Sequence, residues 1–141
     1  MARILCIDDD LDIQQSCRMI LEAVGHEVQT ASNGTDGVKK AQEWQPEVIV
    51  LDVMMTNDTE GFHVAYTLRQ DAMLKNVPIL MLTSINEKSG MKFDPQKDGE
   101  FLPVDLFIDK PISPQVLTES VAKLLATPKD QLNIEGRTHL V

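Results

Sequence analysis

Four short apolar runs, each followed by polar residues, constrain the fold of this chain more than any other feature of its sequence. Runs that are apolar throughout are typical of parallel strands covered by helices on both faces. The carboxyl ends of such strands share one edge of the sheet, where sites are usually built. The polar groups expected at that edge are Asp8-Asp9-Asp10, Asp52, Thr83-Ser84 and Lys110. Carboxylates, a hydroxyl and an ammonium together predict a site for a divalent metal and a phosphoryl group.

Strand-like and helical patterns alternate along the chain, which predicts an α/β fold. The expected strands cover residues 4–7, 27–31, 48–51, 79–82 and 106–109. The spacing predicts a first helix that buries Ile13, Cys17, Ile20, Leu21 and Val24, and a last helix that buries Leu117, Val121, Leu124 and Leu125. We therefore expect a flavodoxin-like, doubly wound sheet of five parallel strands in the order 2-1-3-4-5, with helices on both faces.

Length and charge narrow the class of protein. A chain of 141 residues is enough for one domain with a sizeable core. The formal net charge of −9 and the lack of a Lys/Arg cluster argue against direct contact with nucleic acid. No apolar run approaches the ~20 residues of a membrane span, and the first apolar run begins too early to leave room for a signal peptide. We expect a cytoplasmic protein without a membrane association.

Two segments fall outside the regular pattern. Residues 86–105 form a long stretch rich in Lys, Gly and Pro between the fourth and fifth strands. Residues 127–141 form a polar stretch with little periodicity. We expect the folded domain to cover residues 1–126 and residues 127–141 to be a C-terminal tail or linker.

Three carboxylates are expected to meet at the ends of neighbouring strands, those of Asp8, Asp9 and Asp52. Carboxylates this close repel one another, so either a proton or a cation must lie among them. Oxygen ligands favour Mg²⁺, or Mn²⁺, over zinc. A purely structural alternative is that the acidic run caps the first helix, which is the role we expect for Asp10. That role does not explain Asp52, which ends a different strand.

Two further residues complete the expected site. Lys110 adds a positive charge at the same edge, directly before Pro111, and the hydroxyl of Thr83 can hydrogen-bond a phosphoryl oxygen. Taken alone, each has an ordinary interpretation, a solvated lysine and a β-branched residue at a strand end. The four strand ends together carry the inference.

These segments resemble the receiver domain of two-component response regulators from residue 1 to about residue 126. The matching segments are Ile4-Leu5-Cys6-Ile7-Asp8-Asp9-Asp10, Val50-Leu51-Asp52-Val53-Met54-Met55, Met81-Leu82-Thr83-Ser84 and Asp109-Lys110-Pro111. The resemblance implies a phosphorylation-driven switch in which a sensor histidine kinase or a phosphotransfer protein phosphorylates Asp52. A downstream protein partner would then read the altered surface.

The resemblance also implies a role for each site residue. Asp9, Asp52 and the backbone carbonyl of Met54 would bind Mg²⁺ directly, and Asp8 would act mostly through a metal-bound water. Lys110 would pair with the phosphoryl group. As switch residues, Thr83 would move to hydrogen-bond it and Phe107 would turn inward. Because Phe107 lacks the hydroxyl of the family's usual tyrosine, it could not make that residue's hydrogen bond; its ordinary alternative is a core phenylalanine.

The sequence departs from the family's pattern in two places. Thr56 stands where the family usually has a proline, and the loop to Gly61 is one residue longer. The stretch between Thr83 and Lys110 is also longer than usual, so we expect a short, displaced or irregular fourth helix. The family resemblance assigns the tuning of self-dephosphorylation to Met54 and Ile85, which are apolar here. We therefore expect a long-lived phosphoryl group.

Other classes of protein fit this sequence less well. A Mg²⁺-dependent phosphohydrolase with Asp52 as nucleophile would usually place a second acid two residues later, where this chain has Met54. A flavin-binding protein would require a phosphate-cradling loop in place of the acidic run after the first strand. A phosphate-independent interaction module remains an alternative, as does a receiver excised from a larger regulator. We do not expect an enzyme beyond self-phosphorylation and self-dephosphorylation on Asp52.

Overall fold

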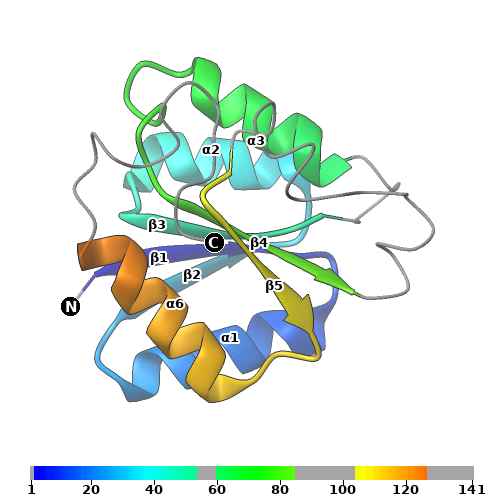
Figure 1. The fold of residues 1–141 in the computed structure, drawn as a ribbon. Helices are drawn as coiled ribbons and strands as arrows, with labels where there is room; N and C mark the ends of the chain where they lie inside the picture. The colour runs from blue at the N-terminus through cyan, green and yellow to red at the C-terminus, as the bar shows by residue number, and fades with distance from the viewer. Residues whose placement is uncertain (1, 54–59, 85–103, 127–141) are drawn as a thin grey trace.

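The computed structural model describes residues 2–53, 60–84 and 104–126, with the backbone alone for three of them, Glu60, Phe62 and Ser84 (Figure 1). Its parallel strands are β1 (Arg3–Ile7), β2 (Glu27–Ala31), β3 (Val48–Asp52), β4 (Ile79–Ser84) and β5 (Leu106–Lys110). They form one sheet in the order β2-β1-β3-β4-β5. The predicted fold class and strand order are therefore confirmed.

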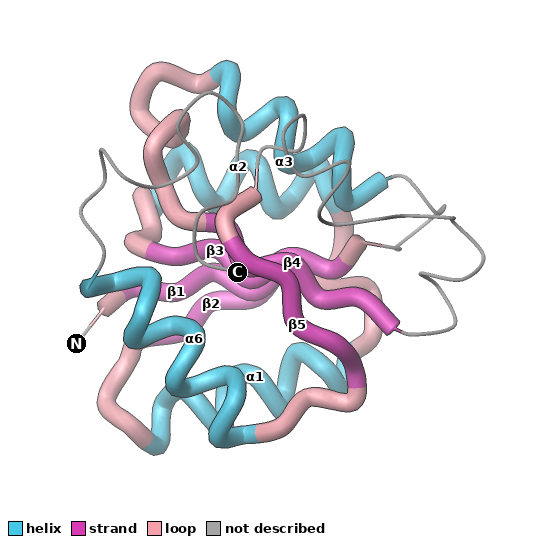
Figure 2. Tube along the Cα trace, viewed as in Figure 1, coloured by secondary structure: helices cyan, strands magenta, loops and turns pink. Residues whose placement is uncertain are grey.

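The described helices cover both faces of this sheet (Figure 2). Helices α1 (Leu11–Ala23) and α6 (Pro114–Ala126) lie on one face, and α2 (Gly34–Trp44) and α3 (Glu60–Gln70) lie on the other. Because every strand runs in the same direction, all five carboxyl ends reach one side of the molecule. Helices α1 and α2 begin at that same side, directly after β1 and β2.

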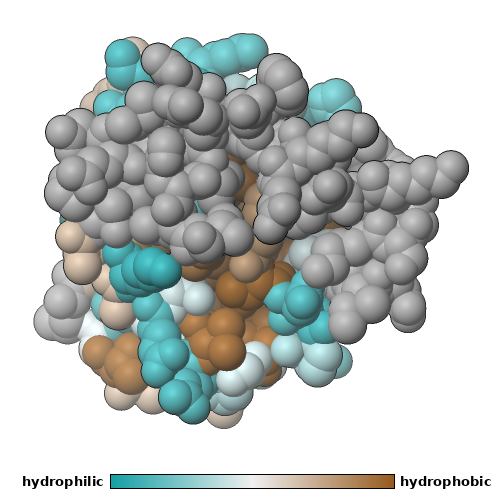
Figure 3. Space-filling model, viewed as in Figure 1, coloured by the Kyte–Doolittle hydropathy of each residue, from teal (hydrophilic) through white to brown (hydrophobic). Residues whose placement is uncertain are grey.

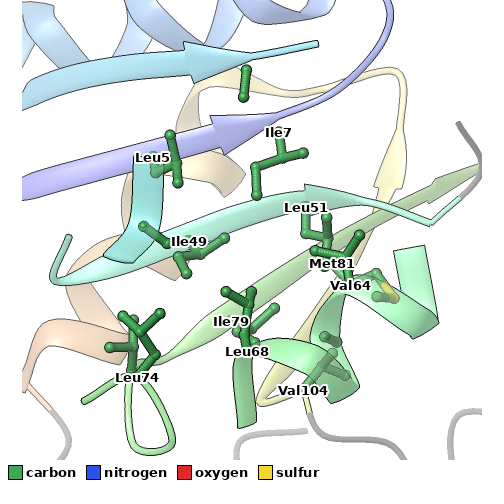
Figure 4. Packing of buried hydrophobic residues seen from close by; sticks show 14 of the residues in the cluster. Leu5, Ile7, Ile49, Leu51, Val64, Leu68, Leu74, Ile79, Met81 and Val104 are labelled. Carbon is green, nitrogen blue, oxygen red and sulfur yellow. The ribbon is translucent and has the colours of Figure 1, made fainter. Parts of the chain in front are cut away.

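Two hydrophobic clusters, one on each face, hold these layers together. Figure 4 shows the first, in which Leu5, Ile49, Ile79 and Met81 from the sheet pack against Leu68 and Val64 of α3. The second cluster joins the alternate residues of the same strands to α1 and α6, through residues such as Cys17, Leu21, Leu117 and Val121. Alternation along each strand thus supplies apolar side chains to both layers, as fully apolar strands require.

The caps of α1 explain where the first helix starts and ends. The side chain of Asp10 accepts hydrogen bonds from the backbone N–H groups of Asp12 and Ile13, so the expected capping role is confirmed. Gly25 follows the helix with a φ of 98°, a left-handed conformation that glycine adopts readily.

Two residues predicted to be buried on helix faces are exposed instead. Val24 is 55% exposed, because α1 already ends at Ala23 and the next residue leaves the helical path. Leu125 is 37% exposed, because its neighbour Leu124 occupies the inward position and Leu125 lies about 100° further around the helix.

An apolar groove of about 260 Å³ lies between β5 and α6. Leu106, Ile108 and Val116 contribute to its lining, and Figure 3 shows apolar surface in this region. The fourth helix, which was expected between β4 and β5, falls within residues 85–103, outside the described residues.

None of the helices in the described ranges has the length and apolar character that crossing a membrane would require.

Candidate phosphoacceptor and metal site

The structure brings three carboxylates together at the carboxyl edge of the sheet. Oxygen atoms of Asp8, Asp9 and Asp52 all lie within 4.8 Å of one another. Asp8 and Asp52 are buried and Asp9 is exposed, so the cluster opens to solvent on one side. Asp8 and Asp9 follow β1, and Asp52 ends the adjacent strand β3. The pairing of Ile7 with Leu51 places these strand ends side by side.

The ammonium group of Lys110 lies against two of these carboxylates. Its Nζ donates a hydrogen bond to Asp52 Oδ1 at 3.0 Å and lies 3.7 Å from Asp8 Oδ2. The lysine ends β5, two strands away from β3, and its side chain is 18% exposed. Among the described residues, one ammonium thus lies against two members of a three-carboxylate cluster, which leaves negative charge in excess there.

The surroundings of Asp8 shift its ionisation. Burial raises its pKa above the ordinary value, and the charges of Asp9 and Asp10 add to that rise. A hydrogen bond from the Asp10 N–H to Asp8 Oδ1, at 2.9 Å, and the charge of Lys110 oppose it. Among the described residues, Asp8 Oδ2 has no hydrogen-bond partner. A buried carboxylate oxygen without a donor is suited to face a cation or its bound water.

The donor set fits Mg²⁺ by its chemistry. Three carboxylates offer oxygen ligands alone, and hard divalent cations prefer such ligands. The fourth predicted ligand, the carbonyl of Met54, lies outside the described residues.

The start of α3 packs directly against the strand that carries Asp52. The Gly61 N–H donates to the Val53 carbonyl at 3.0 Å. A Cβ atom at Gly61 would overlap the carbonyl oxygen of Asp52 and Cα of Val53. Because these are backbone atoms, a side chain could enter only if the strand end moved. Gly61 therefore permits a close approach of helix and strand beside the candidate nucleophile.

The two predicted switch residues lie on β4 and β5. Thr83 is buried, with 2% of its surface exposed, and follows Leu82, which pairs with Asp52. Phe107 is partly buried and packs against the hydrophobic cluster shown in Figure 4. This packing is also what an ordinary core phenylalanine would show, so the switch role stays a prediction.

Sequence reasoning missed Gln14, which packs under the acidic edge. Its side chain is largely buried, and its Nε2 donates to the backbone carbonyl of Asp8 at 2.6 Å and to Ser32 Oγ at 3.0 Å. Its position on the sheet side of α1 was available from helical spacing. A glutamine there carries no motif, so its contacts could not be read from sequence.

A third buried aspartate, Asp105, was also missed, and it lies at the opposite edge of the sheet. Asp105 Oδ2 accepts hydrogen bonds from Arg69 Nη2 at 2.8 Å and from the Ile79 N–H at 2.9 Å. Arg69 also donates to the carbonyls of Leu74, Lys75 and Val77. Burial lowers the pKa of Arg69, and the charge of Asp105 opposes that shift. This pair joins the end of α3 to the start of β5.

The fold and the acidic edge are those of a receiver domain, and comparison with known proteins gives the same family. The model of the response regulator receiver domain family matches residues 4–122, and the chain belongs to this family. It is a receiver domain of the kind found in two-component signalling systems.

Individual relatives include proteins of two sizes. The chain is 37% identical over 123 residues to the alkaline phosphatase synthesis transcriptional regulatory protein PhoP of Bacillus subtilis, covering 87% of this chain and 48% of that protein. It is 28% identical to protein PilH of Pseudomonas aeruginosa, covering 89% of this chain and 99% of that protein. The chain thus spans about half of the first relative and nearly all of the second.

Solved structures give the same fold. The chemotaxis protein CheY4 of Vibrio cholerae has a TM-score of 0.76 and 32% identity to this chain. The match covers 89% of this chain and 99% of that one. A response regulator of Chloroflexus aurantiacus also has a TM-score of 0.76, with 27% identity, and the match covers 89% of this chain and 98% of that one.

Proposed function

We propose that Asp52 is the phosphoacceptor of this receiver. The observation that carries the proposal is the hydrogen bond between Lys110 Nζ and Asp52 Oδ1, beside two further carboxylates at the open edge of the sheet. Asp52 is almost fully buried, yet it lies next to the exposed Asp9, on the side from which a phosphoryl donor can approach.

In this proposal, a carboxylate oxygen of Asp52 attacks the phosphorus of a phosphohistidine on a histidine kinase or phosphotransfer protein. A new O–P bond forms as the P–N bond of the donor breaks, and the imidazole leaves. Lys110 pairs with the added phosphoryl oxygens, which carry more charge than the carboxylate did. Thr83 supplies a hydroxyl for one of these oxygens.

Asp8, Asp9 and Asp52 would hold Mg²⁺, or Mn²⁺ in its place, with the Met54 carbonyl as a further ligand. The bound cation would offset negative charge between the carboxylates and the incoming phosphoryl group. The chain's own residues keep the nucleophile oriented: Lys110 fixes one oxygen of Asp52, and the close approach at Gly61 fixes the end of its strand.

The proposed partners are a histidine kinase or phosphotransfer protein upstream and a protein that reads the phosphorylated surface downstream. We propose no direct nucleic-acid contact by this domain, a cytoplasmic location, and no enzymatic activity beyond turnover of its own aspartyl phosphate. The tuning positions Met54 and Ile85 are apolar, which supports a long-lived phosphoryl group. A lifetime of seconds for the phosphorylated protein would contradict that last point.

Incubation with acetyl phosphate and Mg²⁺, followed by intact-mass measurement, tests the proposal. We expect one added phosphoryl group on the wild type, and none on Asp52→Asn or without the cation. Asp109→Asn is the matched control, because Asp109 is an exposed carboxylate on β5 next to Lys110, and it should still be phosphorylated. If the wild type binds Mg²⁺ yet gains no phosphoryl group from acetyl phosphate or a panel of histidine kinases, a phosphate-independent interaction module is favoured.

A further inference from the structure

The β1–α1 turn carries Asp8 and Asp9, and it lies where two strands separate. The Asp8 N–H still donates to the Ala31 carbonyl of β2 at 3.0 Å, as the last backbone hydrogen bond between the two strands. Beyond this point β1 enters α1 and β2 enters the turn to α2. The carbonyl of Asp8 is buried at this junction and requires a donor from elsewhere.

Gln14 provides that donor from the second turn of α1. Its Nε2 lies 2.6 Å from the Asp8 carbonyl oxygen, 3.0 Å from Ser32 Oγ and 3.4 Å from the Ala31 carbonyl oxygen. The side chain is buried, with 7% of its surface exposed. One amide group therefore ties the turn after β1 to the turn after β2, directly beneath the acidic cluster.

The hydrogen bonds on the opposite side of the turn do not fix it alone. Asp8 Oδ1 accepts from the Asp10 N–H at 2.9 Å, and Asp10 in turn caps α1. Both bonds lie within the turn, so they would move with it if the turn rotated as a unit. The Asp8 N–H bond to Ala31 holds the amide side of the Asp8 backbone to β2, and Gln14 holds its carbonyl side to the turn after β2. Together the two contacts fix the direction in which Asp8 presents its carboxylate.

We propose that Gln14 is a positioning residue for cation binding: its amide holds the backbone of Asp8 so that Asp8 and Asp9 face Asp52. This inference rests on the proposed function, because it requires the acidic cluster to bind Mg²⁺. Groups that orient metal ligands through hydrogen bonds typically change metal affinity by about 10- to 100-fold when they are removed.

The test is a Mg²⁺ titration of the full chain without any phosphoryl donor, followed by NMR. Gln14→Met keeps the length of the side chain and removes the donor, and it should weaken Mg²⁺ binding about tenfold. In the metal-free protein, the amide hydrogens of Asp8 and Asp10 should exchange faster than in wild type. Gln15→Met is the matched control, because Gln15 is the exposed neighbour on the same helix, and its Mg²⁺ affinity should stay at the wild-type value.

Cys17→Ala separates positioning from general stability. Cys17 is fully buried one turn further along α1, so its truncation should lower the free energy of unfolding without changing Mg²⁺ affinity. If Gln14→Met does not fold, Gln14→Asn replaces it. Asn keeps an amide in the buried site but is one methylene too short to reach the Asp8 carbonyl, so the same loss of affinity is expected.

Three results would overturn the inference. Wild-type Mg²⁺ affinity in a folded Gln14 variant would refute the positioning role and leave the proposed function intact. An equal loss of affinity in Cys17→Ala would show that stability alone is responsible. Failure of the wild type itself to bind Mg²⁺ would remove the metal-assisted function and the role of Gln14 with it.

Discussion

Asp105 and Asp8 are both buried beside a cationic side chain, at opposite edges of the same sheet. At the amino edge, Asp105 meets one arginine, and Arg69 also donates to three backbone carbonyls. At the carboxyl edge, one lysine faces Asp8 and Asp52, with Asp9 close by. Counted over the part of the chain that the structure describes, the first arrangement pairs one positive charge with one negative charge, and the second leaves negative charge in excess.

This difference indicates that the amino edge stabilises the fold, whereas the carboxyl edge is suited to bind a cation. A balanced pair loses stability if either partner is removed. A group of carboxylates with too little positive charge gains stability when a carboxylate is neutralised or when a cation is added. Neutralising a carboxylate should therefore lower the free energy of unfolding at the amino edge and raise it at the carboxyl edge.

The largest expected effect is at the balanced edge. Asp105→Asn removes the carboxylate charge that lies 2.8 Å from the buried guanidinium of Arg69. We expect a loss of about 3 kcal/mol in the free energy of unfolding, measured by urea denaturation. A loss of less than about 1 kcal/mol, which is typical of an exposed ion pair, would show that the Arg69–Asp105 pair is not a main link between α3 and β5.

The second effect concerns the cation at the acidic edge. Mg²⁺ at ten times its dissociation constant should stabilise the wild type by about 1.4 kcal/mol, because it binds the native state preferentially. Urea denaturation at constant ionic strength measures this gain. Asp52→Asn should lose most of it, whereas Asp109→Asn should keep it. Equal stabilisation of all three proteins would indicate a general salt effect.

Neutralising Asp8 should act in the opposite direction to neutralising Asp105. Asp8→Asn keeps an acceptor for the Asp10 N–H and removes a buried charge, so we expect a gain of about 1 kcal/mol in the free energy of unfolding of the metal-free protein at neutral pH. Thermal unfolding in the presence of a chelator measures it. A destabilised Asp8→Asn protein would contradict the excess of negative charge.

The sign of the pH dependence follows from the raised pKa of Asp8. Because the native state favours the protonated carboxyl, the wild type loses stability as pH rises through that pKa. Asp8→Asn has no carboxyl group at this position, so its stability does not fall in the same way. The difference in the free energy of unfolding between Asp8→Asn and the wild type should therefore be largest above the raised pKa and disappear below the ordinary value of about 3.9.

The smallest expected effect comes from an exposed pair. Arg3 Nη1 lies 3.7 Å from Glu47 Oε1, and both side chains are more than 40% exposed. Glu47→Gln should change the free energy of unfolding by less than about 0.5 kcal/mol, because solvent screens the interaction. A larger loss in urea denaturation would mean that side-chain exposure does not predict which ion pair, Arg3–Glu47 or Arg69–Asp105, contributes more to stability.

The strand ends could be predicted from the sequence because they depend on local patterns, and the strand order followed from the fold class that alternating strands and helices indicate. Apolar runs mark buried strands, and the residue after each run must lie at the carboxyl edge. The burial of Asp8 and the exposure of Asp9 could not be read in this way, because adjacent residues in a turn share no fixed periodicity. The errors at Val24 and Leu125 arose at helix ends, where periodicity is least informative.

Contacts between distant segments were the other limit. Arg69 and Asp105 lie 36 residues apart, and neither belongs to a motif. The contacts of Gln14 could not be predicted for a related reason, because they form only when the turn after β2 lies beside the turn after β1. Such pairings come from the packed fold and not from spacing along the chain.

The close approach at Gly61 has a consequence for how this site tolerates sequence variation. A library that samples every amino acid at each position should tolerate replacement of Gly61 nearly as poorly as replacement of Asp52, although Gly61 has no side chain to take part in chemistry. Even alanine would press on the backbone that carries the nucleophile. Two neighbouring positions would then be equally restricted for unrelated reasons, one by reactivity and one by space.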